Sequence, residues 1–183
     1  MEFFTNYIRI MNEAISFIDE RSLFQAKQML ISLKENKNKV IIVGNGGSAA
    51  MASHVSVDFT KVAKIRTINF NEADLITCFA NDYGYENWVS KALEAYGDSD
   101  DLLIAISSSG KSLNIINAVN TAKKMNIKTM TFSGFSETNP LRSLGDINFW
   151  VNSKGYNIIE MTHHIWLLAL VDSINEKIEY SAN

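Results

Sequence analysis

Cysteine and proline are nearly absent from this chain of 183 residues, which has one of each. The single cysteine, Cys78, excludes an intramolecular disulfide, and its apolar sequence neighbours predict a buried thiol rather than a nucleophile. Because Pro140 is the only proline and no low-complexity run occurs, the sequence offers no linker between domains. We therefore expect residues 1–183 to form a single domain, long enough to bury a core without disulfides or metals.

An excess of positive charge is also missing, since the formal net charge is −3 and charged residues make up 20% of the chain. A binding surface for nucleic acid is therefore not expected. Long apolar runs are missing too, because the stretch 165–171 is far too short to cross a bilayer. The N-terminus lacks the basic segment and apolar core of a signal peptide. These absences predict a cytoplasmic protein that binds neither nucleic acid nor membrane.

Apolar strand patterns alternate with helical patterns along most of the chain. Residues 2–35 have apolar side chains at helical spacing, which predicts two helices or one bent helix before the first strand. The predicted strands lie at 39–43, 65–70, 102–106, 128–133 and 147–151. Helices are expected at 48–60, 86–96, 113–125 and 158–178. This order is typical of an α/β fold that has a parallel sheet with helices on both faces.

One loop joins the first predicted strand to the helix that follows it and reads Gly44-Asn45-Gly46-Gly47-Ser48. Glycines let backbone N–H groups approach an anion closely, and the N-terminus of the helix adds a favourable dipole. The spacing differs from a nucleotide P-loop and from the dinucleotide fingerprint, which argues against a nucleotide. For a single loop of this kind, an ordinary turn and helix cap would be the simpler explanation.

A second loop of the same kind follows the predicted strand at 102–106. It reads Ser107-Ser108-Ser109-Gly110-Lys111-Ser112, after which the pattern becomes helical. Open α/β sheets bind ligands at the carboxyl ends of their strands. Two hydroxyl-rich loops at that edge therefore predict one phosphorylated ligand that is held from two sides.

Three blocks of this sequence resemble the signature blocks of the sugar-isomerase (SIS) domain family, and within it those of the phosphoheptose isomerase branch. They are Gly44–Ala50, Ala80–Glu86 and Ile106–Ser112. The resemblance extends over nearly the whole chain. It implies a flavodoxin-like, three-layer α/β SIS domain with a central parallel sheet and an N-terminal helical preamble. It also implies a homotetramer whose active sites are shared between subunits.

The same resemblance implies an aldose–ketose isomerase that acts on a sugar phosphate. The reaction would interconvert sedoheptulose 7-phosphate and mannoheptose 7-phosphate, in the heptose biosynthesis that supplies bacterial surface polysaccharides. The residues expected to bind this substrate are Asn45, Gly46, Gly47, Ser48, Asn81, Asp82, Ser107, Ser108, Ser109 and Ser112. The serines would hold the phosphate, while the Asn81–Asp82 pair would position hydroxyl groups.

Members of this branch often bind zinc through a His and a Glu on one helix and a Gln and a His on the last helix. In this chain the corresponding positions are occupied by His54, Asp58, Glu160 and Leu168. A leucine neither transfers a proton nor binds a metal, so the last position departs from the pattern. His164 lies four residues after Glu160, on the same helical face, and can take its place.

The candidate catalytic residues, which are also the candidate zinc ligands, are therefore His54, Asp58, Glu160 and His164, with His163 as the alternative to His164. A pair of histidines that merely lines a helix or subunit contact is equally consistent with the sequence. Isomerisation needs a base beside the carbonyl and an acid or metal at its oxygen. Asp58 or Glu160 is the expected base, with the histidines as acids or metal ligands.

Two departures from the branch leave an alternative function open. Aspartate at position 58 is one methylene shorter than glutamate, so the substrate or its pose must differ, or activity must be low. The histidine missing at Leu168 favours a non-catalytic SIS protein that binds a sugar phosphate or a partner protein, as a replication-initiation factor of this branch does. The presence of His54 and of an acid at position 58 favours an enzyme.

Overall fold

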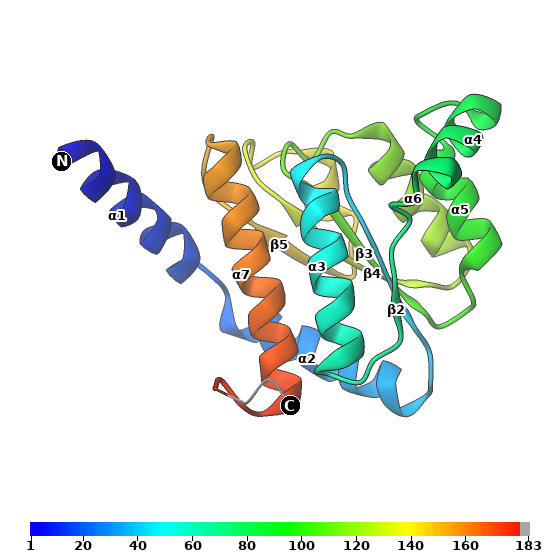
Figure 1. The fold of residues 1–183 in the computed structure, drawn as a ribbon, viewed down its shortest axis with the longest axis horizontal. Coiled ribbons are helices and arrows are strands. Elements are labelled where there is room, and N and C mark those ends of the chain that lie inside the picture. The colour runs from blue at the N-terminus through cyan, green and yellow to red at the C-terminus, as the bar shows by residue number, and fades with distance from the viewer. Residues whose placement is uncertain (180–183) are drawn as a thin grey trace.

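The computed structural model describes residues 1–179 and is built on a parallel sheet of five strands (Figure 1). The strands are β1 (Val40–Val43), β2 (Thr67–Ile68), β3 (Leu102–Ser107), β4 (Lys128–Ser133) and β5 (Ile147–Trp150). Their order is β2-β1-β3-β4-β5, and each neighbouring pair is parallel. This is the strand order of flavodoxin-like folds, so the predicted fold class is confirmed.

The sheet is buried on both faces, and its strand β1 is apolar at every position. All four side chains of β1 are buried, and they alternate between two core clusters. Val40 and Ile42 belong to one cluster, whereas Ile41 and Val43 belong to the other. The sheet therefore needs helices on both sides.

Three layers result from this requirement. Helices α2 (Glu20–Glu35), α3 (Gly47–Lys61) and α7 (Tyr156–Asn175) pack on one face, and α5 (Trp88–Tyr96) and α6 (Leu113–Lys124) pack on the other. A 3-10 helix, η1 (Pro140–Ser143), precedes β5. In Figure 1, α3 and α7 lie side by side and begin at the same end of the molecule. Among residues 1–179, no helix is both long and apolar enough to cross a membrane.

The N-terminal preamble consists of two helices rather than one bent helix. Helix α1 (Glu2–Ser16) ends before Asp19, whose carboxylate accepts a hydrogen bond from the backbone N–H of Arg21 and so caps α2. The C-terminal part of helix α1 contacts α7, where Trp166 Nε1 donates to the Ile15 carbonyl oxygen at 2.9 Å, and its N-terminal part projects from the body of the molecule (Figure 1). None of the residues of α1 is buried. Its apolar side chains Phe3 and Ile8 are consequently exposed in the single chain.

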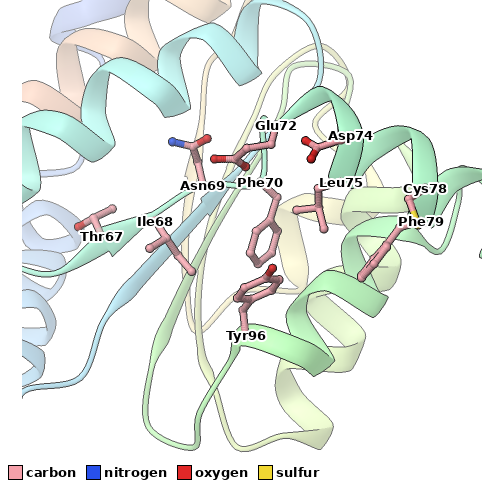
Figure 2. A pocket seen from close by; sticks show the side chains of 10 residues that line it. All are labelled: Thr67, Ile68, Asn69, Phe70, Glu72, Asp74, Leu75, Cys78, Phe79 and Tyr96. Atoms are coloured by element: carbon pink, nitrogen blue, oxygen red, sulfur yellow. The ribbon is translucent and has the colours of Figure 1, made fainter.

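Helix α4 (Ala73–Tyr83) also has no buried residue. It lies at the edge of the sheet, beside the two-residue strand β2, over a hollow of about 700 Å³. Figure 2 shows Phe70, Phe79 and Tyr96 around this hollow, with Cys78 beside Phe79 on α4. The prediction of a buried Cys78 was wrong, since the thiol is exposed. An apolar stretch in the sequence does not ensure burial when its helix lies at the edge of the sheet and no face of the sheet covers it.

Candidate active site

The two predicted phosphate loops meet at the point where the strand order of the sheet reverses. One loop follows β1 and the other follows β3, and these two strands pair directly. The loops enclose a cavity of about 130 Å³. It is lined by Asn45, Ser48, Ile106, Ser107, Ser108, Ser109, Ser112, Tyr156 and Glu160. Six of the predicted substrate-binding residues are thus brought together with Glu160, the candidate base on α7.

Glycine is required at several positions of the first loop, among them Gly44, where a Cβ atom would lie 2.7 Å from the backbone carbonyl carbon of Ser48. Gly46 has φ +55° and ψ −121°, a backbone conformation that other residues rarely adopt, and it lies at the N-cap of α3. At Gly47, a Cβ atom would lie 2.8 Å from the carboxylate carbon of Glu160. The loop therefore turns sharply into α3, and the glutamate packs directly against the backbone of the loop.

Hydroxyl groups form the second loop. The Ser107 hydroxyl donates a hydrogen bond to the Ser112 hydroxyl at 3.0 Å, and Ser109 accepts one from the backbone N–H of Lys111. The hydroxyl of Ser108 differs from these, because it is buried and has no hydrogen-bond partner among residues 1–179. A buried unpaired hydroxyl in the lining of a cavity is suited to a polar ligand that completes its hydrogen bonding.

Three of the candidate catalytic residues form a separate cluster between α3 and α7, which we call the histidine cluster: His54, Asp58 and His164. His54 Nε2 lies 3.2 Å from Asp58 Oδ2, one helical turn away. The rings of His54 and His164 meet edge to face, with their centroids 4.8 Å apart. Nε2 of His164 is buried and has no hydrogen-bond partner in the described part of the chain.

The environment of His164 favours the neutral imidazole. Burial lowers its pKa from the ordinary value, the neighbouring His54 lowers the pKa further, and Asp58 acts in the opposite direction. The side chain of His54 is 53% exposed and that of Asp58 is 27% exposed. The cluster therefore combines one partly buried imidazole with an imidazole–carboxylate pair that faces solvent.

His163 does not take part in this cluster, so the structure gives no support to it as an alternative ligand. Successive residues of a helix are about 100° apart around its axis, and His163 therefore points toward the sheet. Its Nε2 donates to the carbonyl oxygen of Ser133 at 3.0 Å, and its ring packs against Phe132 and Trp166. Complete burial lowers the pKa of His163 to about 4.

Leu168 packs against the core cluster beneath α7 and contributes only apolar contact. Within residues 1–179, no group of three or more His, Cys, Asp or Glu side chains is arranged to hold a metal ion. Glu160 packs against Gly47, whereas His164 contacts His54 further along both helices. The four residues of the predicted zinc set therefore do not converge on one point.

Asn81 and Asp82 lie on α4, outside the lining of the cavity. Both are exposed, and the Asn81 amide donates to the carboxylate of Asp82 at 2.9 Å. Sequence reasoning missed Tyr156, which lines the cavity at the start of α7. Its position four residues before Glu160, on the same helical face, was the available signal.

Comparison with known proteins agrees with this fold. The sequence model of the SIS domain family matches residues 2–134 of this chain. The phosphoheptose isomerase of Helicobacter pylori strain P12 is 34% identical over 161 residues, which cover 85% of this chain and 83% of that protein. The phosphoheptose isomerase of Fusobacterium nucleatum is 35% identical over 161 residues, with 85% and 82% covered.

A solved structure of phosphoheptose isomerase from Neisseria gonorrhoeae superposes with a TM-score of 0.86 at 28% identity and covers 96% of each chain. The parallel sheet and the serine loops at its strand-order reversal define the class as an SIS domain. Together with the sequence identities, they show that the chain belongs to the phosphoheptose isomerase family of SIS-domain proteins.

Proposed function

We propose that this protein is an aldose–ketose isomerase that converts sedoheptulose 7-phosphate to mannoheptose 7-phosphate. The reaction belongs to the heptose biosynthesis that supplies bacterial surface polysaccharides, and from its phosphorylated substrate we infer that it takes place in the cytoplasm. The supporting observation is the cavity in which two serine loops and Glu160 meet. The similarity to phosphoheptose isomerases supports the same reaction and does not favour the non-catalytic alternative.

Phosphate is the group that the serine loops suit best. Among the described residues, the nine that line the cavity include five serines but neither Lys nor Arg. Helices α3, α6 and α7 begin at Gly47, Leu113 and Tyr156, beside this cavity, so that three N-terminal dipoles favour an anion there. The phosphate would accept hydrogen bonds from the hydroxyls and from backbone N–H groups.

Glu160 is the carboxylate that we assign to proton transfer. In a ketose-to-aldose conversion, a base removes a proton from the carbon beside the carbonyl and returns it to the former carbonyl carbon. Glu160 lies in the cavity itself, whereas Asp58 lies outside its lining and pairs with His54. In this proposal Glu160 moves the proton between carbons, and Asp58 orients His54.

The histidine cluster would serve the oxygen atoms of the substrate. As the enediol forms, the oxygen of the former carbonyl gains a proton, and as the enediol becomes the aldose, the neighbouring hydroxyl group loses one, so a group that can both donate and accept a proton is needed there. His164 has an unpaired, buried Nε2 on the same face of α7 as Glu160 and lies beside His54. We assign this role to His164 together with His54, in place of the histidine that the branch has at the position of Leu168.

Zinc is the cofactor that the family resemblance implies, but the residues present do not fit a closed zinc site. Among the described residues, no three donor side chains are arranged so that they could hold a metal ion, and Leu168 supplies no donor. In the proposed reaction, side chains alone therefore transfer the protons, and no step passes through a metal.

The assembly that we propose is a homotetramer of single SIS domains. The support for it is α1, an amphipathic helix that has no buried residue and whose N-terminal part projects from the body of the molecule (Figure 1). Such a helix needs a partner surface for its apolar stripe, and the exposed Met161 and Ile165 on α7 extend the apolar area. Light scattering on the purified protein would measure the mass of the assembly.

The decisive experiment is direct. The purified protein is incubated with sedoheptulose 7-phosphate, and the anomeric proton signals are followed by NMR, in parallel samples with a chelator and with added zinc. Conversion to the aldose in both samples is expected. If no sugar phosphate is converted under either condition, the enzymatic proposal is wrong. Activity that a chelator abolishes and zinc restores would contradict the metal-free mechanism.

A further inference from the structure

Two carboxamides join the two phosphate loops. The Asn45 Nδ2 group donates to Asn114 Oδ1 at 3.0 Å, and Asn114 Nδ2 donates to Asn45 Oδ1 at 2.9 Å. Asn45 lines the cavity from the first loop, whereas Asn114 is the second residue of α6, directly behind the second loop. Because each amide is both donor and acceptor to the other, the pair fixes the separation and the orientation of the two loops.

Tyr85 connects a third segment to this pair. Its hydroxyl donates to Asn45 Oδ1 at 3.1 Å, so that this oxygen accepts two hydrogen bonds, one for each lone pair. A single N–H of the Asn45 amide then remains for a ligand. The amide of Asn45 is therefore engaged mostly with the protein, although the sequence predicted a role in binding substrate.

The burial of Asn114 indicates that the amide pair has a specific purpose. Asn114 is only 2% exposed and lies beside the fully buried Ile115. A buried amide is unfavourable unless it is hydrogen-bonded, and an apolar side chain would satisfy packing alone. Within residues 1–179, both hydrogen bonds of the Asn114 side chain go to Asn45. What the amide adds over an apolar residue is a defined connection to the phosphate loop.

We propose that Asn114 is a positioning residue of the phosphate site. Acting through Asn45, it holds the loops at 44–48 and 107–112 at the spacing that a phosphate group requires. The identity of the sugar phosphate in this inference rests on the proposed function, but the spacing of the loops does not. Loss of the amide pair should weaken binding of the phosphate much more than it slows the chemical step.

The test uses Asn114→Ala, Asn45→Ala and the double variant, with KM and kcat measured on sedoheptulose 7-phosphate. The dissociation constant of inorganic phosphate is measured by calorimetry on the same proteins. Each single variant should raise both KM and this dissociation constant about tenfold, while kcat changes less than about threefold. The double variant should be within about twofold of the weaker single variant, because the two residues act as one unit.

Asn117→Ala is the matched control. Asn117 lies on the same helix and also bonds across to another segment, donating to the carbonyl oxygen of Glu86 at 2.9 Å, but has no contact with Asn45. In the Asn117→Ala variant, KM and the dissociation constant of phosphate should stay within about twofold of the values for the parent protein. If Asn114→Ala lowers the melting temperature too far for assay, Asn114→Leu fills a similar volume and removes the same hydrogen bonds.

Two outcomes would overturn the inference. One is a variant at Asn114 that is less stable but binds phosphate and substrate normally, which would make the pair merely structural. The other is full additivity in the double variant, which would mean that Asn114 does not act through Asn45. If the parent protein converts no sedoheptulose 7-phosphate, the proposed function fails, and the phosphate measurements still decide the role of Asn114.

Discussion

The phosphate cavity and the histidine cluster share helices α3 and α7 but are built in different ways. The cavity is formed by two loops whose glycines, hydroxyls and backbone N–H groups act together. The histidine cluster consists of three individual side chains on the helix surfaces. The serine loops of the cavity agree with the family resemblance, whereas the positions expected to carry the chemistry depart from it at Asp58, Glu160 and Leu168. An anion site depends on backbone geometry that many residues fix jointly, whereas proton transfer depends on single side chains and can move along a helix.

This contrast predicts that substitutions of reacting side chains reduce turnover, while substitutions in the loops reduce binding. The largest effect is expected for Glu160→Gln. Glutamine keeps the size of the side chain but cannot remove a proton, so kcat should fall about 1,000-fold with little change in KM. The rate of conversion of sedoheptulose 7-phosphate, followed by NMR, measures this change.

Glu176→Gln, beyond the other end of α7, is the control and should retain kcat within about twofold. A Glu160→Gln variant with an unchanged kcat and a raised KM would assign Glu160 to binding and would remove it from the chemical step.

The next largest effect is expected on the free energy of unfolding, and it comes from His163, the histidine of α7 that lies outside the histidine cluster. The pKa of His163 is about 4 in the folded protein, below its ordinary value of 6.5. As the pH falls from 6.5 to 4, the unfolded chain binds a proton that the folded protein does not, so stability is lost over this interval. A shift of this size corresponds to on the order of 3 kcal/mol. Urea denaturation at several pH values measures it.

His163→Gln keeps an N–H donor for the Ser133 carbonyl but does not titrate in this range. Its stability should therefore depend less on pH than that of the parent protein. The same pH dependence in both proteins would show that His163 is not the group responsible.

A smaller effect is expected at the contact between the loop and the reacting carboxylate. Gly47→Ala places a methyl group against the carboxylate of Glu160, which must then move. A displacement of about 1 Å at a reacting group can reduce the rate about 100-fold, so a loss of this order in kcat is expected. Steady-state kinetics on the purified variant provide the measurement.

Gly155→Ala is the matched control, because its added Cβ would meet no atom closer than 3.4 Å. It should retain nearly full activity. Should Gly47→Ala be as active as the parent protein, Glu160 would not need the position that the structure gives it.

The smallest effect is expected at Ser108. Its buried hydroxyl has no partner in the described structure, so Ser108→Ala should leave stability nearly unchanged. Phosphate binding should weaken by about tenfold, because the ligand loses one hydrogen bond. Calorimetry with inorganic phosphate and thermal melting measure the two quantities.

Ser90→Ala removes another buried, unpartnered hydroxyl, which lies on α5 away from the cavity. This control should bind phosphate normally. Equal loss of phosphate affinity in both variants would mean that the effect of Ser108→Ala is not local to the cavity.

Much of the fold could be predicted because the strands are short apolar runs followed by glycine or serine loops. The predicted strands at 102–106 and 128–133 agree with β3 and β4 within one residue, and the strand-order reversal brings the two loops together. Edge structure was less predictable. Of the strand predicted at 65–70, only Thr67–Ile68 pairs, and Cys78 beside it is exposed.

The parts of the site that sequence could not supply are contacts between distant segments. Hydrophobic periodicity does not distinguish His163 from His164, because only the packing of α7 decides which one meets the sheet. The pairing of Asn45 with Asn114 joins residues 69 positions apart and has no local signature. Likewise, Asn81 and Asp82 are adjacent to each other in a recognisable block, but that block does not bring them into the cavity of this chain.

The contact between Gly47 and Glu160 also restricts how this family can diverge. Any side chain at position 47 would occupy the space of the carboxylate, and any bulkier group at position 160 would press on the loop backbone. The two positions are therefore constrained jointly, although they lie on different helices. In chains that have lost glycine at position 47, we expect a shorter residue in place of the glutamate, so that the two sites covary among related proteins.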